Sequence, residues 1–266
     1  MKAILRKSTI ILTLGLALIH ILHALTLDRI IQYVEVPFTS PKWPCTLDGY
    51  RIAFISDTHN ISPKRLQRVV DELNNRSIDL LIIGGDLWAH YQRVLDILAG
   101  VETTDGIYGV EGNHDCYVRL FNAMRSYGMV PLSNSGYHIH EGFFLAGLED
   151  MWNRNACIAT AIDDATADDF VLLVSHNPDI AKRQDTTSVD LVVSGHTHAG
   201  QVRFLGIWAP IFTFTNIISN YGRRFVSGWA TSRDGVPVYV SNGIGNVVPR
   251  VFARPQVIIF TMNHGS

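Results

Sequence analysis

Side chains of the types that bind metal ions recur at five places in this chain, each directly after a short apolar run. Carboxylate, imidazole and amide groups hold divalent cations in proteins. Ligands of open α/β sheets bind beyond the carboxyl ends of strands, so residues that follow strands can meet at one edge. The five segments are Ser56-Asp57-Thr58-His59, Gly84-Gly85-Asp86, Glu111-Gly112-Asn113-His114-Asp115, Ser175-His176-Asn177 and Gly195-His196-Thr197-His198.

The donor types in these segments indicate which metals could bind. None of the three cysteines lies among them, which excludes a thiolate zinc site. The mixed donors suit Mn²⁺, Fe²⁺ or Fe³⁺, Zn²⁺ or Co²⁺ without choosing among them. The candidate ligands exceed what one tetrahedral ion needs, and they predict two ions that share a carboxylate, most naturally Asp86. They are Asp57, His59, Asp86, Asn113, His176, His196 and His198.

Each motif alone has an ordinary structural explanation. Asp57 could cap a turn, Asp86 could be a turn aspartate, and His176 could be an incidental loop residue. The joint occurrence of the motifs, each after a strand, favours a metal site.

The segments between these motifs predict alternating strands and helices. Ser62 and Pro63 are typical of a helix start, and Leu66, Val69, Val70 and Leu73 follow at helical spacing. A second helix is expected over Val118–Tyr127, closed by Gly128, and Asn177-Pro178 is expected to open a short one. The pattern predicts an α/β domain over residues 45–266, with a mixed sheet or two packed sheets. The expected strands are Arg51–Ser56, Asp79–Ile83, Gly106–Val110, Phe143–Leu148, Phe170–Ser175, Leu191–Ser194, Val202–Leu205, Val236–Ser241 and Val257–Thr261.

An apolar run near the N-terminus predicts a membrane anchor. Residues Thr9 to Leu27 contain no Asp, Glu, Lys or Arg, and this length approaches the ~20 residues that span a bilayer. The alternatives are a cleaved signal peptide and a buried core helix. We expect an anchor over residues 1–28 and an extended, proline-containing linker over 29–44.

The charges near the run predict its orientation. Lys2, Arg6 and Lys7 precede the run, whereas Arg29 and Lys42 follow it. This margin of one favours a cytoplasmic N-terminus and a single-pass protein whose domain over residues 45–266 is extracytoplasmic.

Overall charge limits the partners. The chain has 22 Lys and Arg against 24 Asp and Glu, a net charge of −2. Because the net charge is near zero and the sequence shows no Lys/Arg cluster, we expect no binding to long nucleic acids.

The motifs DxH, GD, GNHD, H and GHTH, in this order, resemble those of the calcineurin-like metallophosphoesterase superfamily. Further strings, such as Gly195–Gln201 (GHTHAGQ), are similar to the membrane-anchored bacterial branch typified by YkuE and YaeI. The resemblance implies a four-layer βααβ sandwich of two mixed sheets with a dimetal centre. It assigns the first ion to Asp57, His59, Asp86 and His198, and the second to Asp86, Asn113, His176 and His196. It makes His114 the catalytic histidine, with Asp115 positioning its imidazole.

These features predict metal-dependent hydrolysis of a phosphomonoester, phosphodiester or pyrophosphate. A water that bridges two ions is acidified, so hydroxide can attack phosphorus while His114 assists the leaving group. The aromatic segment 202–230 is either sheet core with a loop or an interfacial lid for a lipid- or envelope-derived substrate, whose phosphate Arg223 and Arg224 would bind. The alternatives are a phosphodiesterase or nuclease acting on soluble nucleotides, and a non-catalytic metal-binding scaffold.

Overall fold

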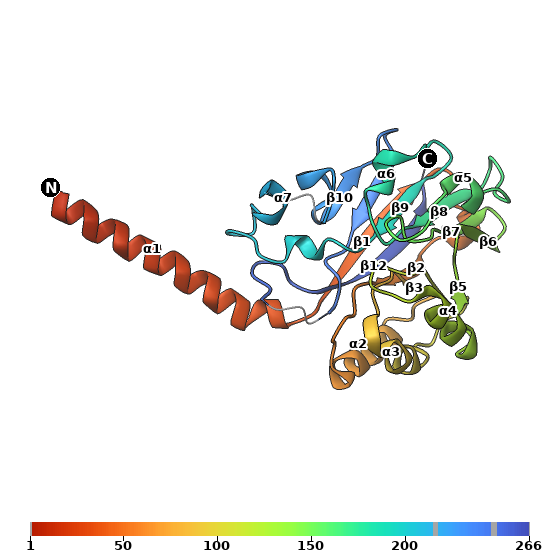
Figure 1. The fold of residues 1–266 in the computed structure, drawn as a ribbon. Coiled ribbons are helices and arrows are strands. Elements are labelled where there is room, and N and C mark those ends of the chain that lie inside the picture. Colours follow the sequence, from red (N-terminus) through yellow and green to blue (C-terminus); the bar gives the residue numbers. More distant parts are fainter. Residues whose placement is uncertain (1, 215–217, 246–248, 266) are drawn as a thin grey trace.

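Two mixed six-stranded sheets form the body of the protein (Figure 1). The computed structural model describes residues 2–214, 218–245 and 249–265. In the first sheet the strand order is β1-β12-β2-β3-β4-β5, where β2 to β5 run parallel to one another and β12 is antiparallel to β2. Its strands are β1 (Gln32–Ser40), β2 (Tyr50–Ile55), β3 (Leu80–Ile83), β4 (Ile107–Gly109), β5 (Val130–Pro131) and β12 (Gln256–His264).

The second sheet has the order β10-β11-β9-β8-β7-β6. Its four central strands are parallel, and its two edge strands are antiparallel to their neighbours. Its strands are β6 (Ser135–His140), β7 (Phe143–Gly147), β8 (Phe170–Val174), β9 (Leu191–Ser194), β10 (Gly228–Thr231) and β11 (Pro237–Val240). The two mixed sheets expected from the sequence are therefore confirmed.

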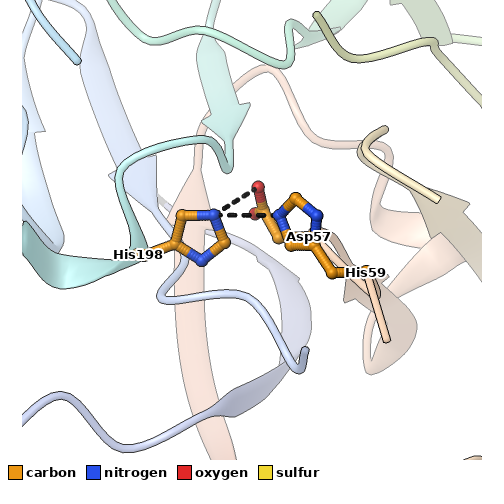
Figure 2. A group of neighbouring side chains, drawn as sticks. All are labelled: Asp57, His59 and His198. Carbon is orange, nitrogen blue, oxygen red and sulfur yellow. Dashed lines mark hydrogen bonds and ion pairs between the residues drawn. The ribbon is translucent and has the colours of Figure 1, made fainter. Parts of the chain in front are cut away.

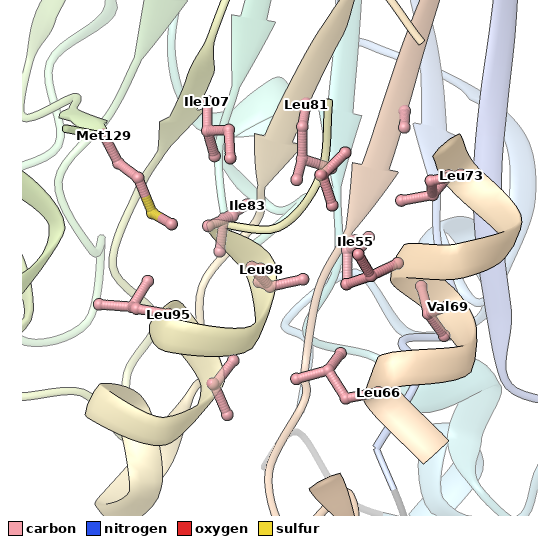
Figure 3. Close-up of a cluster of buried hydrophobic side chains, with 14 of the residues drawn as sticks. Ile55, Leu66, Val69, Leu73, Leu81, Ile83, Leu95, Leu98, Ile107 and Met129 are labelled. Carbon is pink, nitrogen blue, oxygen red and sulfur yellow. The ribbon is translucent and has the colours of Figure 1, made fainter. Parts of the chain in front are cut away.

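Three helices cover the outer face of the first sheet: α2 (Pro63–Asn75), α3 (Tyr91–Leu98) and α4 (Tyr117–Ser126). The i, i+3, i+4, i+7 positions of α2 are fully buried, as the sequence pattern predicts. They pack against Ile55 and Leu81 of the sheet and Leu95 and Leu98 of α3 (Figure 3).

The inner faces of the two sheets pack directly on each other. Phe54 and Ile82 of the first sheet share one buried cluster with Phe170 and Leu172 of the second. A further cluster covers the outer face of the second sheet, where α5 (Ile158–Ala161) and α6 (Ile180–Arg183) lie. The layer order is therefore helix, sheet, sheet, helix, and the expected βααβ order is wrong because no helix layer separates the sheets.

Residues 32–40, expected to be part of a linker, instead form strand β1. This strand pairs in parallel with β12 over nine residues, from Gln32–Gln256 to Ser40–His264. The prolines of this region suggested a free linker, but β1 is an edge strand, where the missing N–H of Pro37 costs no ladder bond.

The observed structure differs from the sequence prediction at several other short elements. The expected strand Val202–Leu205 forms only isolated bridges, Val202 to Val251 and Phe204 to Trp208. Helix α3 and strands β5, β6 and β10 were not predicted, since two to eight residues give little periodicity. The remaining short helices are α7 (Ile211–Phe214), η1 (Leu27–Arg29), η2 (Cys45–Leu47), η3 (Trp88–His90), η4 (His198–Gly200) and η5 (Gly222–Phe225).

Helix α1 (Lys2–Leu25) projects away from the sheets (Figure 1). The span Arg6–Arg29 has a mean hydropathy of 2.2, and none of its most apolar part is buried, so it is long and apolar enough to cross a membrane. Three residues after the end of α1, the buried carboxylate of Asp28 accepts hydrogen bonds from the backbone N–H groups of Phe252 and Ala253, at 2.8 and 2.9 Å. This clamp fixes the end of α1 to the domain.

Candidate metal centre

The loops that follow β2 and β9 bring three potential metal ligands together (Figure 2). The Nε2 atoms of His59 and His198 lie 3.0 Å apart, and Nε2 of His198 lies 3.6 Å from Oδ1 of Asp57. Asp57 and His59 are buried, and the side chain of His198 is only 13% exposed. One cation could therefore contact all three.

A second group forms beside the first and shares Asp57 with it. Nε2 of His176 lies 3.5 Å from Oδ2 of Asp86 and 4.0 Å from Oδ1 of Asp57. Oδ2 of Asp86 also lies 3.7 Å from Nε2 of His59, so this carboxylate faces both groups. Nδ1 of His196 adds a further donor, 3.3 Å from Nε2 of His176. Six of the seven predicted ligands thus converge through these distances.

The backbone of this centre is strained in a way that the sequence did not reveal. Asp57, His59, Asp86, His196 and His198 all have positive φ angles, between 39° and 71°. Non-glycine residues rarely adopt this region, which costs of order 1–3 kcal/mol each. The surrounding structure therefore holds these loops in a conformation that points their side chains inward.

Hydrogen bonds and a close approach fix Asp57. Both of its carboxylate oxygens accept the backbone N–H of His196, at 3.1 Å each. A Cβ atom at Gly195 would lie 2.5 Å from both Oδ2 of Asp57 and Oγ of Ser56. Only glycine fits at this position in the GHTH segment.

Carbonyl groups set the orientation of two imidazoles. Nδ1 of His176 donates to the carbonyl of Gly84 at 2.7 Å, and Nε2 of His196 donates to the carbonyl of Ile218 at 2.8 Å. In the neutral form of each ring the other nitrogen, which faces the centre, can bind a cation. Burial would lower the pKa of His176, but Asp86 and Asp57 outweigh it and raise that pKa to about 10, so a cation bound there would displace its proton.

The charges of the centre perturb several pKa values. Burial would raise the pKa of Asp57, but His198 and His176 outweigh it and lower that pKa. The pKa of Asp86 is also lowered, because His176 and the backbone N–H of His114 outweigh burial. Burial lowers the pKa of His196 to about 4 and that of His198 to about 3. Ionised carboxylates and neutral imidazoles are the forms that bind metals.

Asn113 is the seventh predicted ligand. Its Oδ1 atom is buried and has no hydrogen-bond partner among the described residues, which is costly unless something binds it. Its carbonyl oxygen accepts a bond from Nδ2 of Asn153 at 2.7 Å. The unpaired amide oxygen and the converging carboxylate and imidazole donors fit a site for two divalent cations, and they do not select the metal.

The predicted catalytic histidine lies at the rim of this centre. The side chain of His114 is exposed, and its ring stacks on that of Trp88, with centroids 5.1 Å apart. Its ring centroid lies 6.1 Å from that of His59. The backbone N–H of His114 donates to Oδ1 of Asp86 at 2.9 Å, which ties the two residues together.

The carboxylate of Asp115 binds backbone N–H groups of two loops. Its Oδ2 atom accepts the backbone N–H groups of Asp86 and Gly112, at 2.8 and 2.9 Å, and Oδ1 accepts that of Trp88 at 2.9 Å. Burial and the charge of Asp86 raise its pKa to about 6. The carboxylate therefore fixes the loop that carries Asp86, and the expectation that it also orients the imidazole of His114 stays a prediction.

Two residues near the centre escaped the sequence analysis. Arg250 is buried, and one of its terminal nitrogens lies 3.3 Å from Nδ1 of His198, while the guanidinium also donates to the carbonyls of Asn242 and Ala253. The ring of Trp152 packs edge-on against His196 at 4.6 Å. Neither lies in a recognisable motif, and only the fold brings them to the site.

The predicted phosphate-binding pair lies on a segment that contacts the metal loop. Arg223 and Arg224 are exposed on η5, and the hydroxyl of Thr197 donates to the carbonyl of Val226 at 2.8 Å. The segment 202–230 also includes residues 215–217, which lie outside the described part of the chain.

Comparison with known proteins defines the class. A family model described as calcineurin-like phosphoesterase matches residues 50–200. The chain belongs to this family, and the resemblance inferred from the motifs is confirmed. The catalytic domain is that of a metal-dependent phosphoesterase.

Several curated proteins share much of the sequence. A transmembrane protein with metallophosphoesterase domain from Danio rerio is 28% identical over 263 residues, which cover 88% of this chain and 59% of that protein. The uncharacterized metallophosphoesterase YkuE from Bacillus subtilis (strain 168) is 26% identical over 253 residues, covering 88% and 86%. The uncharacterized protein YpbG from the same strain is 31% identical over 228 residues, covering 79% and 80%. This chain therefore spans less than two thirds of the Danio rerio protein.

Proposed function

We propose that this protein hydrolyses a phosphoester of a lipid- or envelope-derived substrate at a membrane surface, using two divalent ions. The observation that supports this most strongly is the convergence of two carboxylates and four imidazoles from separate loops on one buried point. Such a donor set suits the two-metal sites that catalyse phosphoryl displacement.

We assign one ion to Asp57, His59, Asp86 and His198, and the other to Asp86, Asn113, His176 and His196. Asp86 is the proposed shared ligand, since its Oδ2 atom faces an imidazole of each group. When bound, such ions lower the pKa of water and stabilise negative charge on a phosphoryl group.

His114 then acts on the substrate. Its exposed imidazole, beside the ligand groups but in neither of them, can hydrogen-bond a phosphoryl oxygen and donate a proton to the leaving oxygen. Trp88 supports one face of the ring, and the bond from the backbone N–H of His114 to Asp86 sets its distance from the centre.

The membrane origin of the substrate is supported by two features. Helix α1 is long and apolar enough to span a bilayer. The loop 202–208 carries exposed Phe204, Leu205 and Ile207, the last 83% exposed, and it begins four residues after His198. The ring of His20 in α1 stacks on Phe204 at 5.0 Å and accepts the backbone N–H of Leu205 at 3.1 Å. The apolar loop is thereby held at the level of the last turns of α1.

We further propose that α1 is an uncleaved single-pass anchor with a cytoplasmic N-terminus, so that the catalytic domain is extracytoplasmic. The basis is the small excess of Lys and Arg before the apolar span. Arg223 and Arg224 are proposed to bind the substrate phosphate, because η5 is held against the metal loop through Thr197.

The experiment uses the full chain in phospholipid vesicles, supplemented separately with Mn²⁺, Fe²⁺, Zn²⁺ or Co²⁺. Bound metal is measured together with hydrolysis of p-nitrophenyl phosphate and its bis-ester. We expect about two ions per chain, and Asp86→Ala should remove metal and activity together. Asp96→Ala, which removes an exposed carboxylate from α3, is the matched control and should change neither. Full activity of Asp86→Ala would disprove the proposed centre.

The substrate class is tested by comparing phosphoesters on lipids with soluble nucleotide phosphoesters. We expect the lipid-linked substrates to be hydrolysed faster in vesicles than after dilution into detergent. Equal rates on both classes, unaffected by vesicles, would support a soluble phosphodiesterase instead.

A further inference from the structure

A cavity of about 420 Å³ lies where the chain leaves α1 and enters β1. Four basic side chains line it, and no Asp or Glu does. Its apolar lining comes from Ile30, Ile31 and Tyr33, which follow the apolar span directly. The cations are Arg29 on η1 and Lys64, Arg65 and Arg68 on the first turns of α2.

The charge of this cavity is only partly compensated: Asp71 and Glu72 of α2 act on its Tyr33 but pair with none of its four cations. Within residues 2–214, 218–245 and 249–265, none of the four cations forms an ion pair with an acidic side chain. One terminal nitrogen of Arg65 (Nη2) is buried and has no hydrogen-bond partner there. Burial lowers the pKa of Arg65, and the charge of Arg68 lowers it further. Like charges gathered without a counter-charge are unfavourable, and a bound anion would relieve the repulsion.

The start of α2 adds to the positive potential. The helix has 13 residues, its first turn contains no acidic residue, and the side chain of Ser62 does not cap it. Pro63 has no N–H, and the N–H groups of Arg65 and Leu66 bond to the carbonyl of Ser62, so the helix dipole rather than free N–H groups attracts anions at this end. The dipole and the four cations therefore act on the same space.

The place of the cavity in the fold indicates the source of the anion. Arg29 ends the span that could cross a membrane, and Ile30 and Ile31 follow it without a break. Figure 1 shows α2 on the side of the domain where α1 joins it. Residues between α1 and β1 and residues at the start of α2 together line the cavity. With α1 in a bilayer, the cavity lies at the level of the lipid headgroups. Its mixed lining suits a phosphate together with the start of an acyl chain.

We propose that this cavity binds the phosphate headgroup of an anionic phospholipid next to the anchor. Arg65 and Arg68 contact the phosphate, Lys64 and Arg29 add long-range attraction, and Ile30 and Ile31 contact the glycerol and first methylene groups. This site is distinct from the metal centre, since it contains none of the proposed metal ligands. It requires that α1 is membrane-embedded, but it does not require hydrolysis.

Native mass spectrometry of the full chain, released from micelles with equimolar phosphatidylglycerol and phosphatidylcholine, tests the proposal. We expect preferential retention of one phosphatidylglycerol. The double variant Arg65→Gln/Arg68→Gln should weaken that preference about fivefold for each charge removed. Arg68→Gln alone, at an exposed position, provides a variant that leaves the half-buried Arg65 intact. Arg93→Gln on α3 is the control of equal charge change and should behave as wild type.

Inorganic phosphate distinguishes the two sources of such an anion. If 10 mM phosphate displaced the lipid completely, the site would be one for free phosphate and the lipid proposal would be wrong. Equal retention of both lipids, or equal loss in Arg93→Gln and Arg68→Gln, would also overturn it. Because binding is measured without turnover, its failure leaves the metal-centre proposal standing, and an inactive metal centre leaves lipid binding intact.

Discussion

Replacing Asp115 by Asn separates two roles for this carboxylate. The structure gives it three backbone N–H bonds, two at Oδ2 and one at Oδ1. The amide oxygen of Asn can replace Oδ2, but the amide NH₂ then faces the N–H of Trp88 and cannot accept it. Hydrogen bonds to charged groups contribute about 1.5–3 kcal/mol each. The lost bond and the weakening of the other two predict a loss of about 2–4 kcal/mol.

The assay combines thermal unfolding with Mn²⁺ titration at pH 8, where a carboxylate with a pKa of about 6 is ionised. For a domain of this size, the loss corresponds to a fall in Tm of roughly 5–15 °C. Metal affinity should fall as well, since the loop that carries Asp86 loosens, whereas kcat at saturating metal should change little. Asp164→Asn, at an exposed position, is the control. An unchanged Tm and metal affinity with a hundredfold lower kcat would refute this reasoning and return Asp115 to the role of orienting His114.

Three further predictions concern the site and the membrane. His114→Ala should retain metal and lose on the order of 10²–10⁴ in kcat on a phosphodiester, and near-normal turnover would remove it from the mechanism. Gly195→Ala places a methyl group 2.5 Å from Oδ2 of Asp57, so metal content measured by elemental analysis should drop while the far-ultraviolet circular dichroism stays native. Ile207→Asp removes an exposed apolar side chain from the loop beside α1 and should slow hydrolysis of vesicle-borne substrates, with p-nitrophenyl phosphate turnover unchanged. Equal slowing on both substrates would point to a folding defect.

The ligand residues were predictable because their chemistry and their position after strands are both visible in the sequence. Asp57, Asp86, His176 and His196 follow buried runs of the expected length, and parallel strands bring such ends together. The left-handed backbone of Asp57 and Asp86 was not predictable, because long-range contacts impose it against local preference.

The errors have physical causes that are equally specific. The prolines of residues 32–40 suggested a linker, but an edge position accommodates Pro37 in a strand. Arg250 reaches His198 across 52 positions, a distance that local patterns do not span. The bonds from Asp115 to the backbone of Asp86 and Trp88 were likewise not foreseen, because those residues lie 27 to 29 positions away in sequence.

The short connection between α1 and β1 limits how the enzyme can search for its substrate. Six residues separate Leu25 from Gln32, and Asp28 is bound in the middle of them. Fully extended, six residues reach only about 20 Å, and the clamp shortens this further. With α1 embedded, the protein cannot sweep a volume above the bilayer as a long flexible tether would allow. It diffuses laterally at one height and one tilt, and encounters only molecules that lie in that thin layer.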